Sequence, residues 1–326
     1  ASVYDGATAL AEAAIMAINA NGRKSVLVSS AIDPNYRAVL KTYCDGLDVQ
    51  IDEIAFTGEG VTDQAALASA LAGNTYAAVA IQSPNFFGNV DTFSPAVREA
   101  SAASETVPIA VISEAISLAA LATPASWGAQ IVVGEAQSFG VAMAYGGPYV
   151  GFIATTKEHM RRIPGRLVGK SVDNDGRTAY VLTLQAREQH IRRERATSNI
   201  CTNQAHCALI ATMYLALMGK TGLRDVASLN LERSRELATA VSSVPGVKLR
   251  FTAPFFNEVV VDVGRRAADV LAELQQRGIL GGVDLGRWYP QLSTCVLMNA
   301  TELTTTGDIA ALTTVLGEIV RVHANV

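Results

Sequence analysis

Short β-branched runs alternate with amphipathic stretches through the first half of the chain. The expected strands lie at residues 26–28, 49–51, 77–81, 108–112, 131–133 and 152–154. The expected helices lie at residues 9–20, 34–44, 62–71 and 94–104. Strands that alternate with helices in this way predict an α/β fold with a mostly parallel sheet flanked by helices.

The pattern changes from about residue 229. Helices are expected at 229–241, 267–277 and from 306, with strands at 247–250, 258–263 and 295–298. We therefore predict a large α/β domain over residues 1–228 and a small C-terminal α+β domain over residues 229–326. Thr305 and Asp308 have the spacing of a capping box, which predicts the start of the last helix.

A glycine-rich loop over residues 134–151 joins the strands at 131–133 and 152–154. Ligands of parallel sheets gather beyond the carboxyl ends of the strands. The expected strand ends are polar, and they include Ser29, Gln82, Ser113, Glu114 and residues 135–138. A binding site is expected at this edge, although a simple turn would also explain the glycines.

The stretch over residues 203–219 is apolar on nearly every face of a helix. Its apolar run is shorter than the roughly 20 residues of a membrane span. This pattern predicts a helix buried within the protein, with Leu209 and Met213 in the core. No signal peptide is visible at the start of the sequence.

Composition and charge limit the classes of function. The 326 residues are 49% hydrophobic and 17% charged, which is typical of a soluble globular protein with a sizeable core. The net charge is −4, yet residues 157–195 contain ten Lys or Arg and five Asp or Glu. This basic strip either faces an anionic partner or is a solvated surface. An acidic remainder without a nucleic-acid-binding motif argues against nucleic acid.

The four cysteines have no CxxC spacing, which favours free thiols in a reducing cytoplasm over disulfides or zinc. The charged segment 161–171 has no apolar period and predicts a mobile loop. It ends in Gly169-Lys170-Ser171, but three residues separate Gly165 from Gly169 where a phosphate loop has four. Nucleotide hydrolysis is therefore not expected.

The start of the first helix is a second candidate anion site. Asp5 or Gly6 can serve as its N-cap, and backbone N–H groups at a helix start attract anions. If Asp5 is the cap, its own carboxylate fills part of this site. A bound phosphate is then disfavoured.

Residues 187–204 form the most polar run of the chain. His190 is a candidate general base, although a lone histidine beside Arg and Glu more often forms structural hydrogen bonds. Thr197, Ser198 and Asn199 form a polar turn whose simplest role is to cap the following helix. Cys201 has no clearly placed base and is a poor candidate nucleophile.

Several longer motifs resemble the glycine cleavage system P-protein family, in particular its subunit 1. The matching runs are YDGATALAEA at 4–13, PNFFG at 84–88, VGEAQS at 133–138, GGPY at 146–149, REQHIRRE at 187–194, ATSNICT at 196–202, PFFNE at 254–258 and GILGG at 278–282. They follow the family order over essentially the whole chain. Family members begin well before the position of Ala1, so the resemblance implies a chain truncated at its start.

The resemblance implies a type I pyridoxal-phosphate-dependent transferase-like fold, with pyridoxal 5'-phosphate held by a homologous subunit 2. It also implies a reaction, in which glycine is decarboxylated and its aminomethyl group passes to the lipoyl group of H-protein. Interface roles are expected for Arg187, His190, Arg192, Thr197, Ser198 and Asn199. Gln137 and Ser138 are expected to fill a vestigial cofactor site.

The lysines agree with a cofactor held elsewhere. A pyridoxal enzyme needs a lysine at the strand end that here reads Glu135-Ala136-Gln137-Ser138, because only an amine forms the Schiff base. Only Lys170 could approach from the expected loop. Two alternatives stay open: a self-contained pyridoxal enzyme with a displaced lysine, and a structural or regulatory pseudo-subunit.

Overall fold

The computed structural model describes residues 1–73, 75–200 and 203–324. A seven-stranded sheet has the order β1-β7-β6-β5-β4-β2-β3. Its strands are β1 (Ser2–Val3), β2 (Ser25–Ser29), β3 (Gln50–Ile54), β4 (Ala78–Gln82), β5 (Val107–Ile112), β6 (Ile131–Glu135) and β7 (Gly151–Thr155). The strands from β3 to β6 pair in parallel, and β7 and β1 are antiparallel to their neighbours. The predicted α/β fold is confirmed.

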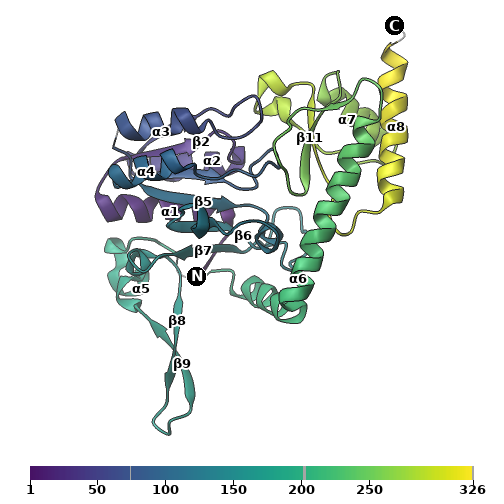
Figure 1. Ribbon diagram of the computed structural model, residues 1–326. Coiled ribbons are helices and arrows are strands. Elements are labelled where there is room, and N and C mark those ends of the chain that lie inside the picture. Colours follow the sequence, from purple (N-terminus) through teal and green to yellow (C-terminus); the bar gives the residue numbers. More distant parts are fainter. Residues whose placement is uncertain (74, 201–202, 325–326) are drawn as a thin grey trace.

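Helices cover both faces of this sheet (Figure 1). The pairs are α1 (Gly6–Asn21) with α2 (Pro34–Asp45) and α3 (Gln64–Gly73) with α4 (Pro95–Ala103). Val26 and Val28 of β2 pack with α1 and α2, whereas Leu27 between them packs with α3 and α4. Successive side chains of a strand point to opposite faces, so an unbroken apolar strand buries both faces.

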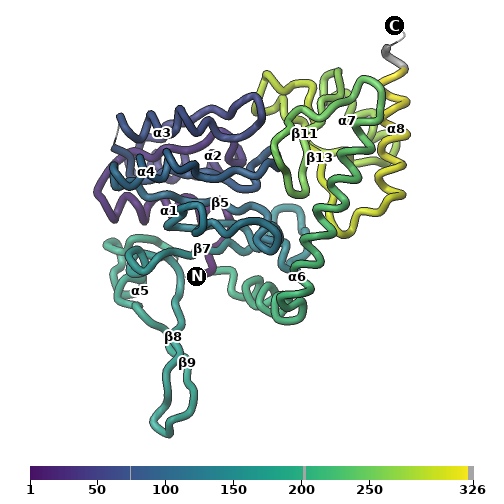
Figure 2. The backbone as a smooth tube through the Cα atoms, in the orientation of Figure 1, coloured from purple at the N-terminus to yellow at the C-terminus, as the bar shows by residue number. Residues whose placement is uncertain are grey.

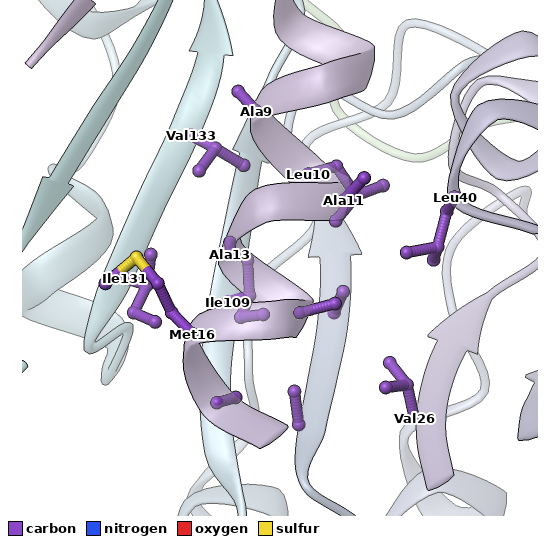
Figure 3. Close-up of a cluster of buried hydrophobic side chains, with 14 of the residues drawn as sticks. Ala9, Leu10, Ala11, Ala13, Met16, Val26, Leu40, Ile109, Ile131 and Val133 are labelled. Carbon is purple, nitrogen blue, oxygen red and sulfur yellow. The ribbon is translucent and has the colours of Figure 1, made fainter. Parts of the chain in front are cut away.

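Helix α1 forms the centre of the larger core (Figure 3). Its buried face includes Ala9, Leu10, Ala13 and Met16. The small alanine side chains allow the helix to lie close to the strands. The helix starts at a capping box, because the Asp5 carboxylate accepts from the Thr8 backbone N–H and the Thr8 hydroxyl accepts from the Asp5 N–H.

The segment after β7 forms a hairpin of β8 (Leu167–Val172) and β9 (Thr178–Thr183). Figure 1 shows it projecting from the body of the molecule. The mobile loop predicted at 161–171 is therefore wrong over β8. The turn is closed by Asp173, whose carboxylate accepts from the N–H groups of Asp175 and Arg177. Short helical turns nearby are η3 (Met160–Arg162), η4 (Gln185–Arg187), α5 (Gln189–Arg192) and η5 (Arg193–Arg195).

Helix α6 (Ala205–Ser242) leads from beneath the sheet to the small C-terminal sheet (Figures 1 and 2). That sheet has the order β10-β11-β13-β12 and is antiparallel. The strands of this sheet are β10 (Lys248–Leu249), β11 (Glu258–Asp262), β12 (Val283–Asp284) and β13 (Cys295–Asn299). The helices beside it are α7 (Ala267–Gln276) and α8 (Thr306–Ala324). Further short turns are η1 (Ala115–Ala119), η2 (Pro124–Trp127), η6 (Leu285–Arg287) and η7 (Pro290–Leu292). The boundary predicted at 228/229 falls inside α6 and stays a prediction.

The first half of α6 contradicts the predicted burial. Leu209 is 55% exposed, Met213 is 56% exposed and Leu217 is 84% exposed. Gly219 has non-helical backbone angles and separates this half from the second, which packs on α8. The helix therefore covers the protein with one face and leaves apolar side chains on the other.

The structure also bears on the cysteines, on the start of the last helix and on membrane spans. The thiols Cys44, Cys207 and Cys295 are free and buried, while Cys201 lies outside the described residues. Thr305 and Asp308 form the predicted capping box. Among the described helices, none is both long and apolar enough to cross a membrane.

Candidate cofactor site at the carboxyl edge of the sheet

The carboxylate of Glu135, the last residue of β6, lies at the start of α1. It accepts hydrogen bonds from the backbone N–H groups of Gly6 (3.0 Å), Gln137 (3.0 Å) and Val150 (2.9 Å). These donors belong to the start of α1, the turn after β6 and the residue before β7. A helix N-terminus with converging N–H groups is an anion site. In this chain a side chain of the protein occupies it.

The rest of this helix start is also occupied. Asp5 caps α1 through the Thr8 N–H at 2.7 Å, as the sequence suggested. A Cβ atom on Gly6 would lie 2.2 Å from the Tyr36 hydroxyl, so a larger residue at this position would displace the Tyr36 side chain. The carboxylates of Glu135 and Asp5 and the Tyr36 side chain therefore occupy the position in which a phosphate group would bind.

Polar groups at the other strand ends pair with one another. The Gln82 side chain accepts from the Asp33 N–H (2.8 Å) and donates to the Ser113 hydroxyl (2.9 Å). The Glu114 carboxylate accepts from the Ile116 N–H at the start of η1 (2.9 Å). Gln82 and Ser113, at neighbouring strand ends, thus pair with each other, whereas Glu114 caps the turn that follows it.

This edge is acidic. Burial, reinforced by the carboxylates of Glu114 and Asp33, raises the pKa of Glu258 to about 8. Burial also raises the pKa of Glu135 and that of Asp33, and the N–H donors to each carboxylate oppose the shift. Burial makes negative charge costly in this region, and only a carboxylate with several N–H donors, such as Glu135, is compensated, so an additional phosphate anion is disfavoured.

Gln137 and Ser138, the expected residues of a vestigial cofactor site, lie at the end of β6. The Gln137 side-chain amide donates to the Val141 carbonyl, and its backbone N–H donates to Glu135. The Ser138 hydroxyl is buried and has no hydrogen-bond partner among the described residues. Both residues therefore belong to the loop that Glu135 holds.

In the polar run after the hairpin, Arg187 has a structural role, whereas His190 and Arg192 are exposed. Arg187 donates to the backbone carbonyls of Ile163 and Gly165 (2.7 Å for Gly165), which fixes the base of the hairpin. Arg192 is exposed and donates to the Ala186 carbonyl. His190 is also exposed, with Nδ1 3.6 Å from the Glu188 carboxylate.

Thr197, Ser198 and Asn199 line a pocket with Glu12 of α1 and the end of α2. The Ser198 hydroxyl donates to the Glu12 carboxyl (2.8 Å) and accepts from the Ile200 N–H (3.1 Å). Glu12 is only 2% exposed, and burial raises its pKa to about 7 against the opposing hydrogen bond from Ser198.

The structure therefore separates the two groups of predicted site residues. Glu12 lies six residues along α1 from Gly6, which is about 9 Å at 1.5 Å per residue. Ser198 contacts this inner part of α1, whereas Gln137 belongs to the group around the helix start. Glu135 and Glu12 organise the two places. The sequence placed Glu135 among the polar strand ends without giving it a role of its own, and it gave Glu12 none. Glu135 contacts Gly6, 129 residues away, and Glu12 contacts Ser198, 186 residues away, so no local spacing marks these two contacts.

The sheet order, the antiparallel β7 and the small antiparallel domain after a long helix define the fold of type I pyridoxal-phosphate-dependent enzymes. A sphingosine-1-phosphate lyase from Burkholderia pseudomallei, only 14% identical, shares this fold with a TM-score of 0.70 over 98% of this chain and 70% of that chain. The family model of the glycine cleavage system P-protein matches residues 1–316. The chain belongs to this family.

Two individual proteins agree with this assignment. A probable glycine dehydrogenase (decarboxylating) subunit 1 from Moorella thermoacetica is 48% identical over 96% of this chain and 69% of that protein. A crystal structure of glycine decarboxylase (P-protein) of the glycine cleavage system, in inhibitor-bound form, is 39% identical, with a TM-score of 0.90 over 98% of this chain and 70% of that chain. The chain accordingly has the role of a P-protein subunit.

The residues at the sheet edge do not fit a covalently held pyridoxal phosphate. Among the described residues, the end of β6 has no lysine, and it presents Glu135 to the helix start instead. The amine for a Schiff base and the free donors for a phosphate are therefore both missing from this part of the chain.

Proposed function

We propose that this chain is the cofactor-free partner in a two-subunit glycine decarboxylase. Together with subunit 2 it decarboxylates glycine and transfers the aminomethyl group to the lipoyl group of H-protein. Pyridoxal phosphate, bound on subunit 2, supplies the electron sink for this reaction. One observation carries this assignment. The chain belongs to the P-protein family, yet the carboxylates of Glu135 and Asp5 occupy the start of α1. The chain alone is expected to be inactive.

The position of Lys170 supports this proposal against a self-contained enzyme. Lys170 lies on β8, in the hairpin that projects from the body of the molecule (Figure 1). Lys24 donates to the Leu47 carbonyl, and Lys248 lies 3.7 Å from Asp262 in the small domain. Neither of these amines belongs to the network at the end of β6.

An exposed apolar surface supports a permanent protein partner. It comprises Leu209, Met213 and Leu217 of α6 with Met143 and Tyr145 of the loop between β6 and β7. The loop packs on this half of α6, because the rings of Phe139 and Tyr214 are stacked with centroids 6.2 Å apart. Apolar patches of this kind mark protein interfaces. We assign the surface to subunit 2, whose existence follows from relatives named subunit 1.

The polar run after the hairpin is the second part of the proposed interface. His190, Arg192 and Asn199 are exposed and available to a partner, with Thr197 beside them in the pocket wall. Arg187 and Ser198 act from inside the chain by fixing the hairpin base and the turn. These are roles at the interface, close to the site that subunit 2 completes. The free buried thiols agree with a cytoplasmic location.

Co-expression with a subunit 2 tests the assignment. The purified pair should release carbon dioxide from glycine when lipoylated H-protein is present, and the chain alone should not. With added pyridoxal phosphate, the chain alone should also show no visible Schiff-base absorption band. A band that disappears in Lys170→Ala would overturn the proposal in favour of a self-contained enzyme.

The filled helix start also favours a second function, a scaffold that shapes subunit 2 without meeting the substrate. His190→Ala and Asn199→Ala discriminate the two, because both side chains are exposed and neither anchors the fold. Reduced turnover in an intact complex supports an interface role beside the substrate. Unchanged turnover with both variants supports the scaffold. Arg187→Ala is a poorer test, because it also releases the hairpin base.

A further inference from the structure

The N–H donors around the Glu135 carboxylate come from three different segments of the chain. Gly6 opens α1, Gln137 lies in the turn after β6, and Val150 precedes β7. Each donates a backbone N–H to the same carboxylate. In the described part of the chain, the hydrogen bonds to this carboxylate all come from N–H donors, which matches an ionised, acceptor-only group.

Glycines bring these segments within reach of one side chain. A Cβ atom on Gly134 would lie 2.0 Å from the Ile112 carbonyl oxygen, so β6 lies directly against β5 at that point. A Cβ atom on Gly151 would lie 2.2 Å from the Asp5 carbonyl oxygen, so β7 lies against the start of α1. The backbone is therefore shaped to place Glu135 between the helix start and the loop.

We propose that Glu135 is an internal anion that takes the place of a bound phosphate in this chain. Its carboxylate closes the anion site at the start of α1 and holds the loop between β6 and β7 on the sheet. The chain thus holds this loop in place without a phosphate ligand. Asp5, which caps the same helix, adds a second negative charge that repels any phosphate from solution.

Hydrogen exchange of the complex with subunit 2 measures this role. The readout is confined to the amides of Gly6, Gln137 and Val150, in peptides of this chain only. It is therefore independent of any cofactor on subunit 2, and it stays interpretable even if the complex does not turn over glycine. Exchange is compared in sodium chloride and in inorganic phosphate at equal ionic strength.

Three variants give the expected pattern. In the original chain, phosphate leaves the exchange of these amides unchanged. In Glu135→Ala, exchange accelerates about tenfold or more, because charge-assisted hydrogen bonds are lost. In Asp5→Ser/Glu135→Ala, which retains a capping hydroxyl, phosphate slows the exchange again. The control Glu99→Ala changes an exposed glutamate of α4 and should leave these amides unchanged.

Each opposite result overturns the inference. Slower exchange of the original chain in phosphate would show that the anion site is open. Unchanged exchange in Glu135→Ala would show that the carboxylate does not hold these segments. Fast exchange that phosphate cannot reverse in the double variant would show that the donors do not form a phosphate site.

Discussion

The buried carboxyl of Glu12 should make the stability of this chain depend on pH near neutrality. Glu12 is 2% exposed and has its hydrogen bond from the Ser198 hydroxyl. Burial raises its pKa from the usual 4.5 to about 7. Glu12→Gln removes the titration while it keeps the size of the side chain and an oxygen that can accept from Ser198. The comparison therefore isolates the proton on Glu12.

The direction in which pH changes the free energy of unfolding follows from the proton bound to Glu12. Below pH 4.5 both the folded and the unfolded chain carry this proton, so the free energy of unfolding is not reduced. Between that value and about 7 the unfolded chain releases the proton while the folded chain keeps it, which favours unfolding. Above the folded pKa the loss is complete. At about 1.4 kcal/mol per pH unit, the full loss is about 3 kcal/mol.

Urea unfolding of the original chain and of Glu12→Gln, followed by circular dichroism at pH 5, 6, 7 and 8, measures the loss. The difference in unfolding free energy between the two proteins should shift by about 2 to 3 kcal/mol against the original chain from pH 5 to pH 8. Other titrating groups, such as Glu258, are present in both proteins and largely cancel. Parallel pH profiles for the two proteins would refute a raised pKa at Glu12.

Leu209→Ala and Met213→Ala should each cost less than about 1 kcal/mol in the isolated chain, because both side chains are about half exposed. The same variants should weaken association with subunit 2 in a binding titration, whereas Leu237→Ala, at a fully packed site of α6, should cost about 2 to 5 kcal/mol of stability. Charge reversal at Arg161 and Arg162 in the basic strip should slow association with an acidic partner, H-protein or subunit 2, at low salt. The difference from the original chain should vanish as salt rises, and salt-independent rates would identify the strip as solvated surface.

The parallel sheet could be predicted because its strands are marked by local composition. Val26, Leu27 and Val28 form an apolar run, and each of these side chains finds an apolar face. A run of this kind between amphipathic helices is compatible with few folds other than a parallel sheet covered by helices. The hairpin was missed although it has a local signal, since Asp175-Gly176 lies between two runs with strand composition. The high charge before Leu167 concealed it.

The site could be predicted only in part. Asp5 as a cap depends on Thr8, three residues away, and such spacing is visible in a sequence. Glu135 depends on Gly6, 129 residues away, and Ser198 depends on Glu12, 186 residues away. The sequence identified the strand end as the place where a lysine is missing. It could not show which side chain replaces the ligand, because that requires the sheet to bring β6 beside the start of α1.

The first half of α6 shows why burial could not be predicted from hydrophobicity alone. A helix that is apolar on every face is expected to be buried, because its side chains are unfavourable in water. The sequence does not show whether the same chain or a second protein buries it. Cys207 and Ala211 face the chain and are buried, while Leu209 and Met213 on the same helix are exposed. On the assignment proposed above, subunit 2 covers these exposed side chains. The exposed half of the apolar run at 209–218 is then explained by the proposed interface and not by the core of this chain.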